Sequence, residues 1–208
     1  MIQYRNARED NLMQVLKENV KEKIYQAAIE EFYEKGFLKA KMQDIAKKAG
    51  ISVGLTYSYY HNKEDLFAAI VEPIYQEIIQ SLENREASDS EIGDPANLFE
   101  QESAFILQLF REKREIFLIL IDRSKGTRFE KAEEQIIEVT KEHIKRQLSS
   151  RVNGQMFKID KVFYHILANN FIEGLLEIAR HYQGSQWAEN MLKTLTHQYY
   201  YGVSGFRG

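Results

Sequence analysis

Apolar residues recur at helical spacing along almost the whole chain. In the first strongly periodic segment, about 20–34, residues such as Ile24 and Phe32 fall on one face and predict an amphipathic helix. Shorter segments at about 42–49 and 53–60 continue the pattern. No segment keeps the apolar–polar alternation expected of a half-buried strand. The pattern therefore predicts an all-α protein.

Start and stop signals divide the first third of the chain into short helices. Gly36 is expected to end the first helix, and Gly50 to turn the chain after the second. Ser52 is placed to cap the third helix, and Asn62 to cap a long fourth helix that begins at Lys63. Two short helices joined by a glycine turn are typical of a helix-turn-helix, in which the second helix enters the DNA major groove.

Longer helices are predicted beyond this unit. Pro73 lies inside the fourth helix and is expected to kink it, as a hinge or as a static bend. The polar segment 88–95 reads as a loop, and Pro95 as the first residue of the next helix. The remaining apolar segments predict helices at about 98–109, 116–121, 128–150, 160–182 and 185–203.

These elements suggest three regions. Residues 1–19 would form an N-terminal arm or an extra helical segment, and residues 20–66 a three-helix helix-turn-helix domain. Residues 67–208 would form a second helical domain.

Composition narrows the class of protein. The chain has 208 residues and no cysteine, which excludes disulfides, thiol nucleophiles and Cys-ligated zinc. No apolar run approaches the roughly 20 residues that span a bilayer, and the first residues lack the apolar core of a secretory signal. We expect a cytoplasmic protein with no membrane association.

The net charge of −3 hides a local excess of lysine. Between residues 35 and 63 the only acidic residue before Lys63 is Asp44. The lysines of this stretch are Lys35, Lys39, Lys41, Lys47, Lys48 and Lys63. Because phosphate contacts come from one face of a protein, a local basic patch of this kind is compatible with DNA binding.

The segment 50–66, GISVGLTYSYYHNKEDL, resembles the tetracycline-repressor (TetR) family of bacterial transcription regulators. The resemblance extends back through Ala27-Ala28, Phe32, Gly36-Phe37, Asp44-Ile45-Ala46 and Ala49, about the first third of the chain. Beyond residue 72 only length, helicity and helix order match. The resemblance implies a homodimeric DNA-binding regulator that pairs through about 160–182 and 185–203. It also implies a repressor that a small-molecule effector releases from a palindromic operator.

The resemblance also implies a set of DNA-contacting residues. They are Lys41, Gln43, Ser52, Val53, Gly54, Leu55, Tyr57, Ser58, Tyr59 and Lys63. Tyr57 and Lys63 match positions that contact phosphate. Gln43 could pair with adenine, and Val53 and Leu55 could touch thymine methyl groups. The neighbouring Tyr60 matches an aromatic core position.

The chain departs from the family pattern in three ways. Lys41-Met42 stands where a Ser or Thr usually caps the second helix, so this cap is expected to be weak. Thr56 replaces a common aliphatic residue. The predicted recognition helix lacks arginine, the commonest reader of guanine, which favours an operator rich in A·T pairs.

Polar residues within apolar helices are the only indication of a ligand pocket. With nearby aromatic residues, the candidates are Phe105, Gln108, Phe117, Asp122, Tyr164, His165, Asn169 and Glu173. A buried polar group needs a partner, which could be a largely apolar ligand or another side chain of the protein.

Two other classes of function remain as alternatives. An all-α enzyme would need a recognisable site, but the sequence has no HExxH, di-iron, P-loop or nucleophile-elbow pattern. His143 and His181 are predicted on solvent-facing turns, so no metal site or cofactor is predicted. The second alternative is a regulator that acts through protein partners with degenerate DNA binding, which the weak cap at Lys41-Met42 would favour.

Overall fold

The computed structural model describes residues 2–88, 95–151 and 160–204. These residues form α-helices and no strand, so the predicted all-α class is confirmed. The helices are α1 (Ile2–Lys39), α2 (Met42–Ala49), α3 (Val53–Tyr59), α4 (Lys63–Ser88), α5 (Pro95–Glu112), α6 (Arg114–Asp122), α7 (Ala132–Arg151), α8 (Lys161–Arg180) and α9 (Ser185–Ser204). Within the described ranges, no helix is long and apolar enough to cross a membrane.

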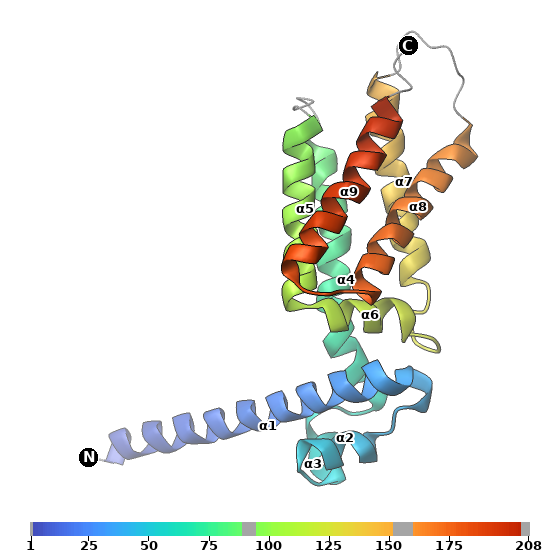
Figure 1. Ribbon diagram of the computed structural model, residues 1–208. Coiled ribbons are helices and arrows are strands. Elements are labelled where there is room, and N and C mark those ends of the chain that lie inside the picture. Colours follow the sequence, from blue (N-terminus) through green and yellow to red (C-terminus); the bar gives the residue numbers. More distant parts are fainter. Residues whose placement is uncertain (1, 89–94, 152–159, 205–208) are drawn as a thin grey trace.

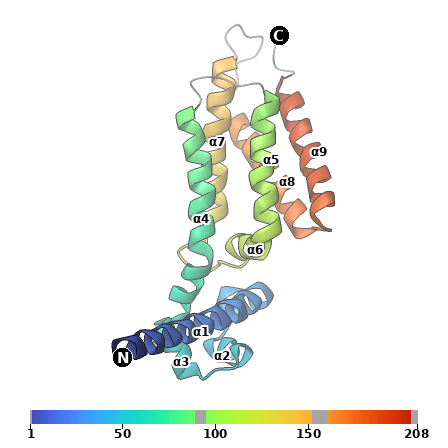
Figure 2. The same cartoon turned by 90° about the vertical axis from the view of Figure 1, so that its left-hand side faces the viewer.

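The helices form two parts that α4 connects (Figure 1). Helices α1, α2 and α3 form the lower part, and α5 to α9 form a bundle around the upper part of α4. Helix α6 lies across the lower end of this bundle, where it contacts both α1 and α4 (Figure 2). Because of this position, α6 is a second connection between the two parts.

Three phenylalanines form the centre of the lower part. The ring of Phe67, on α4, lies edge-on to Phe32 and Phe37, with centroid separations of 5.0 and 5.2 Å. All three side chains are buried. Edge-to-face pairs of this kind each contribute about 0.5–1.5 kcal/mol beyond the burial of area, so they hold the start of α4 firmly against α1.

Gly36 interrupts α1, as the sequence predicts, but not with the left-handed conformation of a usual helix-ending glycine. Its φ of 71° and ψ of 166° lie in a region that is essentially restricted to glycine. A short helical turn follows and ends at Lys39. This break allows the chain to reverse toward α2.

Helix α1 begins much earlier than the predicted start at residue 20. Residues 2–19 are helical and continue into the rest of α1. Of the two predicted alternatives, an arm or an extra helical segment, this part of the chain is the helical segment. This half of α1 extends away from the body of the molecule (Figure 1). Met13, Val15 and Leu16 are exposed on it.

The start of one later helix differs from the prediction. Helix α7 begins at Ala132 rather than near residue 128, because turns occupy the preceding residues. There the Ser124 hydroxyl donates to the Phe129 carbonyl at 3.1 Å, and the Phe129 amide donates to Thr127 Oγ1 at 3.0 Å. Helix α4 continues through Pro73 as one helix, and the kink predicted there stays a prediction. Most of the predicted 88–95 loop, residues 89–94, lies outside the described residues.

We expect Gly36→Ala to lower the free energy of unfolding by about 1–3 kcal/mol, because alanine is strained in this backbone conformation. Urea unfolding followed by circular dichroism would measure the loss. Gly54→Ala is the matched control. Gly54 lies in α3 with open space around an added Cβ, so its substitution should not lower stability and should raise it by up to about 1 kcal/mol, since alanine is favoured over glycine in a helix. Equal effects of the two substitutions would contradict a backbone conformation at Gly36 that only glycine adopts without strain.

Candidate nucleic-acid interface

The turn between α2 and α3 is built by local backbone and capping bonds. Gly50 has left-handed dihedrals (φ 69°, ψ 31°), and its amide donates back to the last turn of α2. The Ser52 hydroxyl accepts from the Leu55 amide at 3.2 Å and caps α3. Asn62 caps α4 through the Asp65 amide at 2.8 Å. The predicted turn and both predicted caps are therefore confirmed.

Helix α3 has one exposed face and one buried face. Thr56 and Tyr60 are buried, which confirms the core role predicted for Tyr60. Thr56 also donates its hydroxyl to the Ser52 carbonyl at 3.3 Å, so the polar replacement is accommodated inside the domain. On the two sides of the helix flanking Thr56, Leu55 and Tyr57 are 39% and 43% exposed although both are large. The core of the chain does not use these two side chains.

The residues predicted to contact DNA all lie at least partly at the surface. Exposed or half-buried on α2, α3 and the ends beside them are Lys41, Gln43, Ser52, Val53, Gly54, Leu55, Tyr57, Ser58, Tyr59 and Lys63. The Ser58 hydroxyl donates to the Leu55 carbonyl at 2.7 Å, which leaves its oxygen able to accept a bond. Contact of these residues with DNA stays a prediction.

The start of α2 has no side-chain cap. Lys41 occupies the capping position with an extended backbone and makes no capping bond, as the sequence predicts. Met42, the next residue, is buried. The amides of the first turn of α2 are therefore not satisfied by a side chain, and the N-terminus of a helix is a favourable place for a phosphate.

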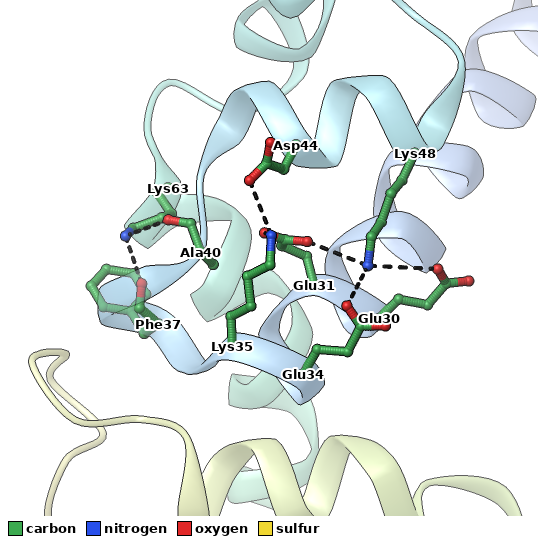
Figure 3. A network of polar contacts seen from close by, with 9 residues as sticks. All are labelled: Glu30, Glu31, Glu34, Lys35, Phe37, Ala40, Asp44, Lys48 and Lys63. Atoms are coloured by element: carbon green, nitrogen blue, oxygen red, sulfur yellow. Dashed lines mark hydrogen bonds and ion pairs between the residues drawn. The ribbon is translucent and has the colours of Figure 1, made fainter.

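A buried carboxylate connects α1 to α2 (Figure 3). Glu31 on α1 is fully buried and lies 2.6 Å from Lys35 Nζ and 3.3 Å from Lys48 Nζ. Lys35 continues to Asp44 at 3.1 Å, and Lys48 to Glu34 at 2.9 Å. These bonds raise the pKa of both lysines, mainly through Glu31 for Lys35 and through Glu34 for Lys48. The network fixes α2 against α1 and therefore positions the turn and α3.

This network changes the basic patch predicted from the sequence. Glu31 and Glu34 lie immediately before the lysine-rich segment 35–63, in which Asp44 is the only acidic residue. Two of the lysines in the patch are neutralised by these carboxylates. Among the described residues, Lys39, Lys41 and Lys47 are exposed and form no ion pair. The surface available to phosphate is therefore narrower than the sequence suggests.

Lys63 has a structural role that the sequence did not reveal. Its Nζ donates to the carbonyls of Phe37 at 2.6 Å and Ala40 at 3.0 Å, and lies 4.3 Å from the centre of the Phe37 ring. Partial burial lowers the pKa of this amine. Since an ammonium group has three donors, one remains for the predicted phosphate contact.

The bundle encloses a second candidate site, an apolar cavity of about 90 Å³. Helices α4 to α9 all contribute to its wall. The lining residues are Ile78, Ser81, Leu82, Phe105, Ile106, Leu109, Phe110, Phe117, Ile121, Ile136, Thr140, His143, Ile144, Phe171, Ile172, Leu175 and Tyr199. Of the pocket residues predicted from sequence, Phe105 and Phe117 line this cavity.

The polar residues predicted for the pocket lie elsewhere. Asp122 forms an ion pair with Arg180 at 2.8 Å, and Glu173 lies 3.6 Å from the same guanidinium. Gln108 is exposed and bonds to Glu112, and His165 is exposed as well. Neither Tyr164 nor Asn169, both half-buried, lines the cavity. The sequence allowed either a ligand or another side chain as the partner of these polar residues. Other side chains of the protein are the partners of Asp122, Glu173 and Gln108.

His143 is the clearest error of the sequence reading. It is only 6% exposed and lines the cavity, whereas the sequence predicted a solvent-facing position. His181, by contrast, is exposed as predicted. The missed signal is helical spacing, because Ile136, Thr140 and His143-Ile144 recur every three to four residues and all face inward.

Comparison with known proteins identifies the lower part of the molecule. Residues 24–70 match the model of the bacterial regulatory proteins of the tetR family. The chain is 34% identical over 91 residues to YvdT of Bacillus subtilis (strain 168), an uncharacterized HTH-type transcriptional regulator, and this match covers 44% of the chain and 47% of YvdT. It is 40% identical over 55 residues to the HTH-type transcriptional repressor SCO4008 of Streptomyces coelicolor, which covers 26% of the chain and 29% of that protein. The chain therefore matches less than half the length of either relative.

Solved structures share the fold over nearly the full length. A TetR-family regulator from Bordetella parapertussis 12822 has a TM-score of 0.67 at 16% identity, covering 88% of this chain and 94% of that one. NalD of Pseudomonas aeruginosa, the secondary repressor of the MexAB-OprM multidrug efflux pump, has a TM-score of 0.60 at 20% identity, with 89% and 96% covered. The predicted resemblance to the TetR family and the predicted two-part helical fold are both confirmed.

We expect the double substitution Lys35→Met and Lys48→Met to lower the free energy of unfolding by about 3–5 kcal/mol, because it leaves the Glu31 carboxylate buried without a counter-charge. Adding Glu31→Leu should restore most of this loss. Urea unfolding of the three proteins, wild type, double and triple, provides the measurement. A triple variant as unstable as the double variant would show that Glu31 is not the source of the cost.

Proposed function

We propose that this TetR-family chain is a sequence-specific DNA-binding transcriptional regulator, and that it is a dimeric repressor released from a palindromic operator by a small molecule. The observation that carries the proposal is the exposed face of α3. Leu55 and Tyr57 are large side chains left outside the core on a helix positioned by Gly50 and Ser52. Exposed side chains of this kind on a recognition helix are suited to base edges and phosphates in the major groove.

The charge around α3 supports contact with the DNA backbone. Lys41 and Lys47 lie at the two ends of α2, and both are exposed without an ion pair within the described residues. The uncapped amides at the start of α2 add a further phosphate site. Phosphate contacts fix the orientation of the protein on DNA but do not read its sequence. Reading is therefore assigned to α3 and to Gln43.

Helices α8 and α9 are proposed as the dimer interface. Val162, Ile166 and Met191 are 62%, 44% and 39% exposed on these two helices. Leu176 and Leu192 are fully buried within the chain and are not available to a partner. A two-fold dimer would place two recognition helices about 34–36 Å apart, the spacing of two half-sites in a palindrome.

Helix α6 is the proposed route from the cavity to α3. Phe117 and Ile121 of α6 line the cavity. Immediately after the C-terminal end of α6, the Arg123 carbonyl accepts from the Phe37 amide of α1 at 3.0 Å. The turn that follows α6 also packs closely against α1. Gly126 of this turn lies so near the Leu38 side chain that an added Cβ would be only 2.6 Å from a Leu38 methyl carbon. A displacement of α6 would therefore move α1 and the helices fixed to it.

The size of the cavity indicates how a ligand would act. Sites for drug-sized ligands are roughly 300–1,000 Å³, and this cavity is about 90 Å³. A ligand of that size would have to push the surrounding helices apart. It would release DNA only if it prefers the expanded state and if that state does not fit the operator.

Selection of the purified protein on random duplex DNA tests the proposal. The wild-type chain should enrich a palindrome, and the double variant Tyr57→Ala, Lys41→Ala should lose that enrichment. Lys63 is left intact because its bonds to Phe37 and Ala40 make any loss of binding ambiguous. Absence of enrichment at low salt would reject sequence-specific DNA binding and favour regulation through a protein partner.

The salt dependence of operator binding gives a second prediction. Each lost phosphate contact reduces the slope of log K against log salt concentration by about 0.9. The double substitution Lys41→Ala and Lys47→Ala removes up to four contacts from a dimer, so the slope should fall by about 2–4. Lys131→Ala, an exposed lysine in the bundle, should leave the slope unchanged. Equal slopes for all three proteins would place the phosphate contacts elsewhere.

A further inference from the structure

We propose that the bundle cavity selects an uncharged, mainly apolar molecule with one hydrogen-bonding group, which the Thr140 hydroxyl beside His143 would hold. This inference rests on the proposed ligand-responsive function, and it specifies the chemistry of the effector. It follows from the composition of the cavity wall, from the bonding of Thr140 and from the size of the cavity.

Within the described residues, the wall of the cavity has no carboxylate, ammonium or guanidinium group that could neutralise a charged ligand. Its described lining residues are aliphatic and aromatic, with Ser81, Thr140, His143 and Tyr199 as the polar ones. None of them is Asp, Glu, Lys or Arg. Moving an ion from water into such surroundings is strongly unfavourable unless a counter-charge is present. The cavity should therefore reject carboxylates and ammonium ions that have the same apolar body as an accepted ligand.

Thr140 supplies the polar contact. Its side chain is buried, and Oγ1 has no hydrogen-bond partner among the residues that the structure describes. A helical threonine can instead satisfy its hydroxyl on the carbonyl one turn earlier, as Thr196 of this chain does with the Leu192 carbonyl. A buried hydroxyl without a partner is costly. Because Thr140 lines the cavity, a ligand that donates or accepts one hydrogen bond could remove this cost.

His143 makes this part of the wall polar over a wider area. It follows Thr140 by three residues, so both side chains lie on the same face of α7, and both line the cavity. An imidazole ring offers donor and acceptor nitrogens on opposite sides. Thr140 and His143 therefore place two polar groups together on the α7 side of the wall, which suits a ligand with its polar group at one end.

The size of the cavity favours small ligands as probes. An engineered apolar cavity of about 150 Å³ accepts benzene, and this one is about 90 Å³. A single aromatic ring should enter after small shifts of the lining side chains. Phe105, Phe110 and Phe117 provide aromatic surface for it.

Four probes with the same body and different end groups test the selection. They are 4-ethylphenol, ethylbenzene, 4-ethylbenzoate and protonated 4-ethylbenzylamine, each titrated calorimetrically into the full-length chain at neutral pH. We expect 4-ethylphenol to bind at least tenfold more tightly than either ion. Ethylbenzene should bind more weakly than 4-ethylphenol and more tightly than the ions. An ion that binds within about threefold of 4-ethylphenol would overturn the inference.

Two substitutions test the role of Thr140. Thr140→Val keeps the shape of the side chain and removes the hydroxyl, so it should weaken 4-ethylphenol binding about three- to tenfold. The same variant should bind ethylbenzene as well as the wild type does. Thr140→Ser retains the hydroxyl and should keep the preference for 4-ethylphenol. Equal effects of Thr140→Val on both probes would assign Thr140 a purely structural role and overturn the inference.

The DNA selection separates this inference from the proposed function. A chain that selects a palindrome but binds none of the probes at about 1 mM would overturn the inference and leave DNA binding intact. A chain that binds the probes in the expected order but selects no DNA would support the inference and overturn the proposed DNA-binding function.

Discussion

The backbone of Phe37 is the constraint on which the arrangement of the two parts depends. Its amide donates to the Arg123 carbonyl immediately after α6, and its carbonyl accepts from Lys63 at the start of α4. One residue of α1 is therefore bonded at both connections between the two parts. The geometry is possible because Gly36 adopts a backbone conformation closed to other residues, which lets the Phe37 ring pack against Phe67.

The sequence predicted the helix-turn-helix well because its signals are local. The Gly50 turn and the caps at Ser52 and Asn62 each involve residues no more than four positions apart, so one sequence is enough to recognise them. The start of α7 was missed although its bonds are also local. The turn there depends on Ser124 and Thr127 bonding to the same residue, which no periodicity of apolar positions reveals.

The candidate functional residues also differ in whether local or long-range contacts position them. The exposed side chains of α3 follow from a seven-residue helix with known caps, whereas the pocket depends on contacts between distant segments. Asp122 and Arg180 are 58 positions apart, and their ion pair moves a predicted pocket residue out of the pocket. The Glu31 network had a similar effect, since its carboxylates pair with Lys48 and so removed it from the predicted basic patch. The packing of the helices decides which polar residues form pairs. These pairs cannot be predicted from a single sequence.

The cavity has an energetic consequence for any switch. An unfilled volume of about 90 Å³ in an apolar core costs about 2 kcal/mol of stability at roughly 24 cal/mol per Å³. A ligand that fills the cavity would recover this cost only in the conformational state whose cavity fits the ligand. The resulting difference in affinity between the two states is what can shift the equilibrium between them. Because α6 supplies Phe117 of the wall and ends next to the Phe37–Arg123 bond, expansion of the wall in the proposed switch would act directly on the junction. The proposed switch would therefore need no long chain of contacts between the bundle and α3.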